Sequence, residues 1–139
     1  MQIREGHGWR LQLDPQRRPF TALIGGQHWA IELEPGELAC LRRGVITLIG
    51  QRRQLQELLM PEEELDLELD LSLPAPETQD AGAGSLFVAL SGTAESWTLR
   101  FVLTPAGDRR AAEGGWTPEA SPALAAALEG LGEGLDGAA

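Results

Sequence analysis

The stretch from Leu65 to Leu73, LDLELDLSL, decides the class of fold. Five leucines alternate without a fault with three carboxylates and a serine. Because successive side chains of a β-strand point to opposite faces of a sheet, this period of two predicts a strand with one apolar and one acidic face. The sequence therefore predicts a sheet that packs one face on a core and turns the other toward water.

The acidic face of this strand does not predict a metal site. Asp66, Glu68 and Asp70 would stand about 6.6 Å apart, whereas Ca²⁺ needs several oxygens that converge at about 2.3 to 2.6 Å. We expect a face that is solvated or paired with arginine, and Arg100 is the candidate cross-strand partner. Like charges this close together also oppose edge-to-edge aggregation.

Further strands and a short helix are predicted after this stretch. The segment 74–85 is rich in proline and glycine, which predicts a mobile loop. Ser121 suits the cap of a helix and Pro122 its first position. The predicted elements are, in order, a hairpin of 86–91 and 96–103, a short strand at 108–113, a helix at 121–131 and a flexible tail at 132–139.

A long helix is predicted before the acidic strand, over residues 36–60. Pro35 suits its first turn and Pro61 would stop it. A helix of this length could cross a whole sheet or reach a second subunit, so a homodimer through residues 36–60 is a prediction. Gly44 beside the stripe would let another element approach closely. The apolar stripe has a three-four spacing and consists of Leu38, Leu41, Val45, Leu48, Leu55 and Leu59.

Arg52 occupies the stripe position between Leu48 and Leu55. Two interpretations stay open. Either its stem packs while its head reaches water, or it forms a paired charge at a subunit interface.

The amino-terminal part predicts a three-stranded antiparallel meander. Its strands are expected at 9–13, 20–24 and 28–33, and Gly25-Gly26 supplies the turn between the last two. The whole chain is thus predicted as an α+β protein with a single domain at 1–131. Two sheet-plus-helix halves contribute about three and then about four strands, with one long and one short helix.

Composition points to an acidic protein of the cytoplasm. The 139 residues carry a net charge of −10, and residues 61–85 hold eight acids and no base. Such a charge repels the phosphates of nucleic acid at long range. No apolar run approaches the ~18 residues that span a bilayer, the first residues lack the apolar stretch of a signal peptide, and Cys40 alone cannot form an internal disulfide. We expect no membrane association.

The sequence offers no recognised catalytic or cofactor site. His7 and His28 have no partner at metal-ligand spacing, and Cys40 lacks the flanking signature of a cysteine enzyme. Phosphate loops, dinucleotide fingerprints and nucleophile elbows do not occur. We therefore expect a protein that is not an enzyme and that binds no metal or cofactor.

Five arginines form a candidate patch for a partner or for nucleic acid. Arg42 and Arg53 project from the same flank of the long helix, and Arg43 lies further round. Arg17 and Arg18 could complete the patch. The alternative is that these are ordinary solvated charges. Tryptophans can stack bases, but strand alternation favours core packing for Trp9, Trp29 and Trp97.

Several segments resemble a cyanobacterial family of uncharacterised proteins. The matching segments are EGHGWR at 5–10, LIGGQHWAIEL at 23–33, ELLMPEE at 57–63 and RRAAEGGW at 109–116. The fold of that family is similar to the Whirly-like regulators that bind single-stranded DNA, in which four-strand-plus-helix units pair through their helices. The resemblance implies no established activity, cofactor or catalytic residue.

Two functions follow as hypotheses. The first is a non-enzymatic cytoplasmic protein-interaction or regulatory module, since the chain lacks reactive motifs and contains a long helix. The alternative is a single-stranded nucleic-acid-binding protein, which rests on the fold analogy and on the arginines.

Overall fold

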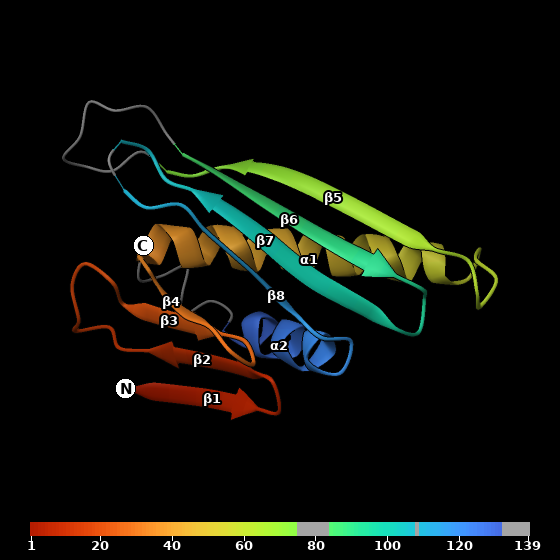
Figure 1. Ribbon diagram of the computed structural model, residues 1–139, viewed down its shortest axis with the longest axis horizontal. Helices are drawn as coiled ribbons and strands as arrows, with labels where there is room; N and C mark the ends of the chain where they lie inside the picture. Colours follow the sequence, from red (N-terminus) through yellow and green to blue (C-terminus); the bar gives the residue numbers. More distant parts are fainter. Residues whose placement is uncertain (75–83, 108, 132–139) are drawn as a thin grey trace.

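Two four-stranded antiparallel sheets and two helices make up the protein (Figure 1). The computed structural model describes residues 1–74, 84–107 and 109–131. Strand order in each sheet follows the sequence, so each sheet is a meander. The first sheet consists of β1 (Gln2–Gly6), β2 (Trp9–Leu13), β3 (Ala22–Gly25) and β4 (Ala30–Leu33), and the helix α1 (Pro35–Gln56) follows it. The second sheet consists of β5 (Leu65–Ser72), β6 (Ser85–Gly92), β7 (Trp97–Thr104) and β8 (Ala112–Trp116), and the helix α2 (Ala120–Glu129) follows it.

The predicted α+β class and the long and short helices are confirmed. The acidic strand and the hairpin that follows it occur as β5, β6 and β7. The predicted tail at 132–139 and most of the predicted loop at 74–85 lie outside the described residues.

Two strands depart from the predicted pattern. The first sheet has four strands, because β1 pairs with β2 although Ile3 is its only large apolar residue. β8 lies at 112–116 instead of 108–113, with Gly114 and Gly115 inside it. Those glycines resemble a turn in the sequence, but a Cβ on Gly114 would lie 2.6 Å from the ring of Trp29. Packing of Trp29 against the bare backbone explains a strand that propensity disfavours.

Both helix boundaries also differ from the prediction. α1 ends at Gln56, four residues before the predicted end. Ser121 does not cap α2 but lies fully buried inside it, where its hydroxyl donates to Thr117 O at 2.8 Å and accepts from the Leu99 amide at 2.9 Å. The Thr117 hydroxyl accepts from the Ala120 amide at 3.1 Å. The prediction for Ser121 was therefore wrong, because Ser121 joins α2 to β7.

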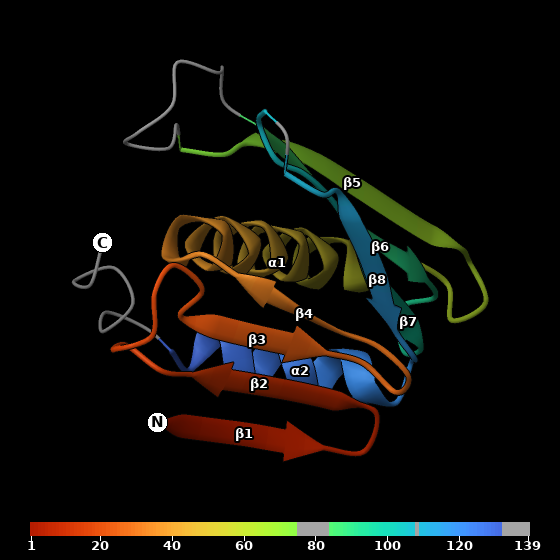
Figure 2. The ribbon, with the colours of Figure 1, turned by 60° about the vertical axis from the view of Figure 1, so that its left-hand side comes forward.

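Each helix packs mainly on the sheet of the other half. α1 follows the first sheet in the chain but lies across β5 and β6 of the second. α2 follows the second sheet but packs mainly on β2 of the first, and the two helices contact each other (Figure 2). Neither half therefore covers its own sheet with its own helix.

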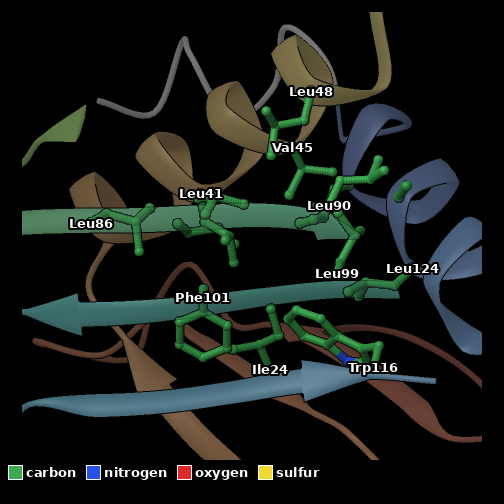
Figure 3. Close-up of a cluster of buried hydrophobic side chains, with 14 of the residues drawn as sticks. Ile24, Leu41, Val45, Leu48, Leu86, Leu90, Leu99, Phe101, Trp116 and Leu124 are labelled. Atoms are coloured by element: carbon green, nitrogen blue, oxygen red, sulfur yellow. The ribbon is translucent and has the colours of Figure 1, made fainter. Parts of the chain in front are cut away.

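A single hydrophobic core joins the two sheets and both helices (Figure 3). The α1 stripe is buried through Leu48, whereas Leu55 and Leu59 are only half-buried. Gly44 lies where β5 and β6 cross the helix, and a Cβ there would stand 2.7 Å from Leu71. The expected close approach at Gly44 is thus confirmed. Leu90, Leu99, Phe101 and Leu124 continue the core toward α2.

Two tryptophans hold the sheets together by reciprocal hydrogen bonds. Trp29 Nε1 donates to Gly115 O at 3.2 Å, and Trp116 Nε1 donates to Gly25 O at 3.0 Å. The two rings are 5.2 Å apart, and each lies 5.6 Å from the ring of Phe101. The expected core role of Trp29 is confirmed, and Trp97 is buried as well.

Neither helix of the described chain has the length and hydrophobicity needed to cross a membrane.

Candidate functional site

The outer edge of β5 is the longest unpaired edge strand in the described residues. β5 has eight residues and pairs with β6 on one side; within the described chain nothing pairs with its other side (Figure 1). An edge of this kind presents a row of backbone amides and carbonyls that lack partners. We call this strand and its two flanking rows of side chains the β5 edge.

The two rows of the β5 edge differ sharply in chemistry. Asp66, Glu68 and Asp70 are exposed on the outer face of the sheet. Leu67, Leu69 and Leu71 point to the inner face but stay half-buried, because α1 covers this edge incompletely. The edge therefore offers an acidic row on one side and an apolar row on the other.

Little on the outer face neutralises the acidic row. The Ser91 hydroxyl donates to Asp66 at 2.9 Å. Arg100 lies on the predicted face, but its guanidinium sits 5.1 Å from the centre of the Phe87 ring. Among the described residues no ion pair joins Arg100 to the acidic row, so of the two expected arrangements, solvated or paired with arginine, the structure has the solvated one.

The segment between α1 and β5 extends this surface. Leu58 is 78% exposed and Met60 is 61% exposed, so two large apolar side chains close together in sequence lie at the surface. The exposed carboxylates of residues 62–64 follow directly. The family segment ELLMPEE at 57–63 spans most of this surface, and the acid-rich composition of residues 61–85 indicates its charge.

The five candidate arginines lie in different parts of the fold. Arg17 pairs with Glu32, and Arg18 donates to Pro15 O at 2.7 Å within the same loop. Arg42 donates to Leu128 O at 2.9 Å and so satisfies the carboxyl end of α2. The remaining two, Arg43 and Arg53, are exposed on α1.

Arg52 follows neither of its two expected arrangements fully. Its guanidinium lies 5.1 Å from the centre of the Trp97 ring and donates to Ala94 O at 2.5 Å. Its buried Nε has no hydrogen-bond partner among the described residues. Arg52 therefore serves contacts inside its own chain.

The nucleophilic and imidazole side chains do not converge. His7 lies 4.0 Å from Glu119, but the two side chains are 77% and 74% exposed. His28 is exposed, and Cys40 is buried in α1. Burial raises the pKa of the Cys40 thiol, although Arg43 opposes the shift, which disfavours the nucleophilic thiolate. The described residues contain no group of three or more potential ligands placed to hold a metal ion.

A second feature, the intersheet cleft, lies between β4 and β8. Its volume is about 710 Å³. Phe20, Ile31, Leu103 and Pro105 contribute apolar walls from both halves of the chain. Both bordering strands are sheet edges that pair on one side only within the described residues.

Glutamates at the start of α1 reach this cleft. Glu34 forms an ion pair with Arg109 of the β7–β8 connection, and this hydrogen bond raises the pKa of Arg109. Glu37 is only 8% exposed, and its Oε1 accepts from the Glu34 amide at 2.8 Å. Burial raises the pKa of Glu37, while the Glu34 amide and Arg109 lower it in part. Neither Glu34 nor Glu37 was predicted as a site residue, although their spacing of three residues before an apolar stripe could have indicated a helix start. Arg109 lies in the family segment at 109–116, but nothing in the sequence indicates its pairing with Glu34.

Comparison with known proteins agrees with the expected cyanobacterial relatives. No curated protein matches the chain. Among solved structures it is similar to a protein of unknown function from Prochlorococcus sp. NATL2A, a cyanobacterium, which is described as a member of the DUF155 family. That protein is 32% identical; the match covers 94% of this chain and 98% of that chain, with a TM-score of 0.79. Residues 4–131 match the model of a domain of unknown function, DUF1818, and the chain therefore belongs to the DUF1818 family.

Proposed function

We propose that this protein is a non-enzymatic interaction module that binds a basic, extended polypeptide segment along the β5 edge. The observation that carries the proposal is the combination of an unpaired eight-residue edge with separate acidic and apolar rows. Addition of a strand to an exposed sheet edge is a common mode of peptide recognition, in which backbone hydrogen bonds give affinity and side chains give specificity.

The side chains of the β5 edge indicate which segment would fit. A strand added to β5 places alternate residues beside Asp66, Glu68 and Asp70, and the others beside the half-buried leucines. Lys or Arg alternating with apolar residues satisfies both rows. Exposed Leu58 and Met60 add apolar surface near the start of the strand.

The same charges oppose pairing of β5 with β5 of a second copy. A symmetric antiparallel pair centred on Glu68 would place Glu68 opposite Glu68 and Asp66 opposite Asp70. Like charges directly opposite each other destabilise such a pair. The acidic row therefore favours a different, basic chain.

Panning of a library of short displayed peptides on the protein tests the proposal. We expect the enriched peptides to alternate Lys or Arg with apolar residues. Their affinity should fall by roughly tenfold in Glu68→Arg. Glu113→Arg is the matched control, because Glu113 is exposed on β8 of the same sheet, at its opposite edge.

Two outcomes would contradict this function. One is enrichment of peptides without basic residues, and the other is an equal loss of affinity in Glu68→Arg and Glu113→Arg. Circular dichroism of both variants checks that each still folds.

Single-stranded nucleic-acid binding is the second candidate. The arrangement of two four-strand-plus-helix units supports the resemblance to Whirly-like regulators, whereas the exposed acidic row opposes binding of phosphates on the outer face of β5. Fluorescence anisotropy with labelled single-stranded DNA and RNA at about 50 mM and about 200 mM salt tests it. Binding that weakens steeply with salt and is lost in Arg42→Glu with Arg53→Glu would favour this candidate over the first.

A further inference from the structure

Glu37 is a largely buried carboxylate with one hydrogen-bond donor and no ion pair among the described residues. It is 8% exposed, and only Oε1 accepts a hydrogen bond from the described residues, from the Glu34 amide. The side chain lines the intersheet cleft. A buried carboxylate is costly unless a cation or several donors compensate it.

The other acidic groups of the cleft already have cations. Glu34 is paired with Arg109, and Glu32 is paired with Arg17. Arg109 also acts on Glu37, but its guanidinium donates to Glu34. Glu37 is therefore the cleft carboxylate that lacks a cation of its own among the described residues.

The walls of the cleft suit an aliphatic chain. Phe20, Ile31, Leu103 and Pro105 form apolar surface around the glutamates. The volume of about 710 Å³ lies within the usual range of small-molecule sites. A divalent metal fits poorly, because hard cations need six or more oxygens and the described residues hold no suitable cluster.

We propose that the intersheet cleft binds an aliphatic cation, an ammonium or guanidinium group on a methylene chain, with the cation at Glu37 and the chain along Phe20, Ile31 and Leu103. Such a group is supplied either by a free diamine or by a lysine or arginine side chain of a polypeptide. The site is independent of the β5 edge, so either proposal can fail alone.

Proton binding at Glu37 must compete with this cation. The pKa of Glu37 is raised by burial, so in the empty cleft the carboxyl holds its proton at higher pH than an ordinary glutamate. Affinity for the cation should rise with pH through the titration of Glu37 and then level off. The charged groups that face Glu37 or line the cleft with it are Glu32, Glu34, Arg109 and Arg110.

Isothermal titration calorimetry with cadaverine, a free diamine, tests the site. We expect cadaverine to bind, pentanediol of similar shape not to bind, and Glu37→Gln to weaken cadaverine by roughly tenfold or more. Glu113→Gln removes the same charge outside the cleft and should leave the affinity unchanged. N-acetyl-lysine methylamide is the second probe: tighter binding than cadaverine supports a polypeptide side chain, and weaker binding supports a free diamine.

Further measurements keep the test decisive if Glu37→Gln folds poorly. Ala111→Trp narrows the cleft from its exposed rim and should also abolish binding. Amide chemical shifts of Ile31 and Ala112 should move when cadaverine is added to the unaltered protein. Equal binding of pentanediol, no binding of either amine, or an unchanged affinity in a folded Glu37→Gln variant would each overturn the proposal.

Discussion

At the scale of the residue, Glu37 combines a helix-capping role with an unusual acid–base environment. An acid whose pKa is raised in the folded state binds its proton more tightly folded than unfolded. The stability it contributes is therefore present below the ordinary glutamate pKa and is lost as pH rises through the raised pKa of Glu37.

This environment predicts a pH-dependent difference between the protein and Glu37→Gln. The free energy of unfolding of the unaltered protein should fall relative to the variant as pH rises from the ordinary glutamate range, and then the difference should become constant. Urea denaturation of both proteins at a series of pH values measures it. A difference that stays constant throughout would show that Glu37 titrates normally.

Trp116 carries a second residue-scale prediction. Trp116→Phe removes the donor to Gly25 O and leaves that buried carbonyl without its partner, which costs about 1–3 kcal/mol. We expect thermal and urea unfolding to show a loss of about 2 kcal/mol. Trp9→Phe is the control, because Trp9 is half-buried and lies outside the cluster of Trp29, Phe101 and Trp116. An equal loss of unfolding free energy in Trp9→Phe would show that the smaller ring, and not the lost hydrogen bond, causes the effect.

At the scale of the element, two glycines of α1 differ in the space that surrounds them. A Cβ on Gly44 would stand 2.7 Å from Leu71 and 3.1 Å from Val88, whereas a Cβ on Gly50 would meet nothing within 4 Å. Alanine favours a helix by about 1 kcal/mol over glycine, and overpacking costs about 1–3 kcal/mol. Gly50→Ala should therefore raise the free energy of unfolding by up to about 1 kcal/mol, and Gly44→Ala should lower it. A higher free energy of unfolding in both variants would contradict this expectation, because it would show that β5 moves to make room for a Cβ at Gly44.

The elements that could be predicted from sequence are those whose two faces differ. β5 alternates without a fault, and α1 carries a stripe that its burial reproduces through Leu48. β1 has no such contrast and is held by pairing with β2. β8 contains Gly114 because the ring of Trp29, which is distant in sequence, occupies the place where a Cβ of residue 114 would lie.

At the scale of the whole molecule, the exchange of helices makes the two halves depend on each other. α1 covers β5 and β6, and α2 covers β2, so each half alone would expose the apolar face of its sheet. Fragments 1–60 and 61–139, made separately, should lack a cooperative thermal transition, and mixing them should restore one. A cooperative transition of either fragment alone, followed by circular dichroism, would contradict this dependence.

Self-association through the long helix remains a separate prediction. The apolar stripe at 38–48 is buried inside the chain. A homodimer through residues 36–60 would therefore use the outward face of α1 with Arg43 and Thr47, or the exposed Leu58 and Met60 in the segment after α1. Sedimentation velocity should show a dimer at high concentration that Leu58→Lys with Met60→Lys dissociates. A monomer at every concentration would contradict the predicted self-association.

The candidate sites could be predicted only in part. The acidic row of the β5 edge is visible in the sequence because its residues are neighbours along one strand. The intersheet cleft is not, because Phe20, Glu37, Leu103 and Arg109 come together only through the contact of the two halves. The family segments at 23–33 and 109–116 both line the cleft, through Ile31 and Arg109 among others. Outside the cleft the same two segments are joined by the hydrogen bonds of Trp29 and Trp116.

Amide hydrogen exchange, recorded by NMR with and without a peptide that alternates Lys with Val, tests the proposed use of the β5 edge most directly. Added strands protect the amides with which they pair. We expect the outward-pointing amides of residues 65–72 to gain protection, with little change in β8 at the opposite edge of the same sheet. Protection confined to other elements, or no gain in β5 at saturating peptide, would contradict a β5 edge that recognises basic chains.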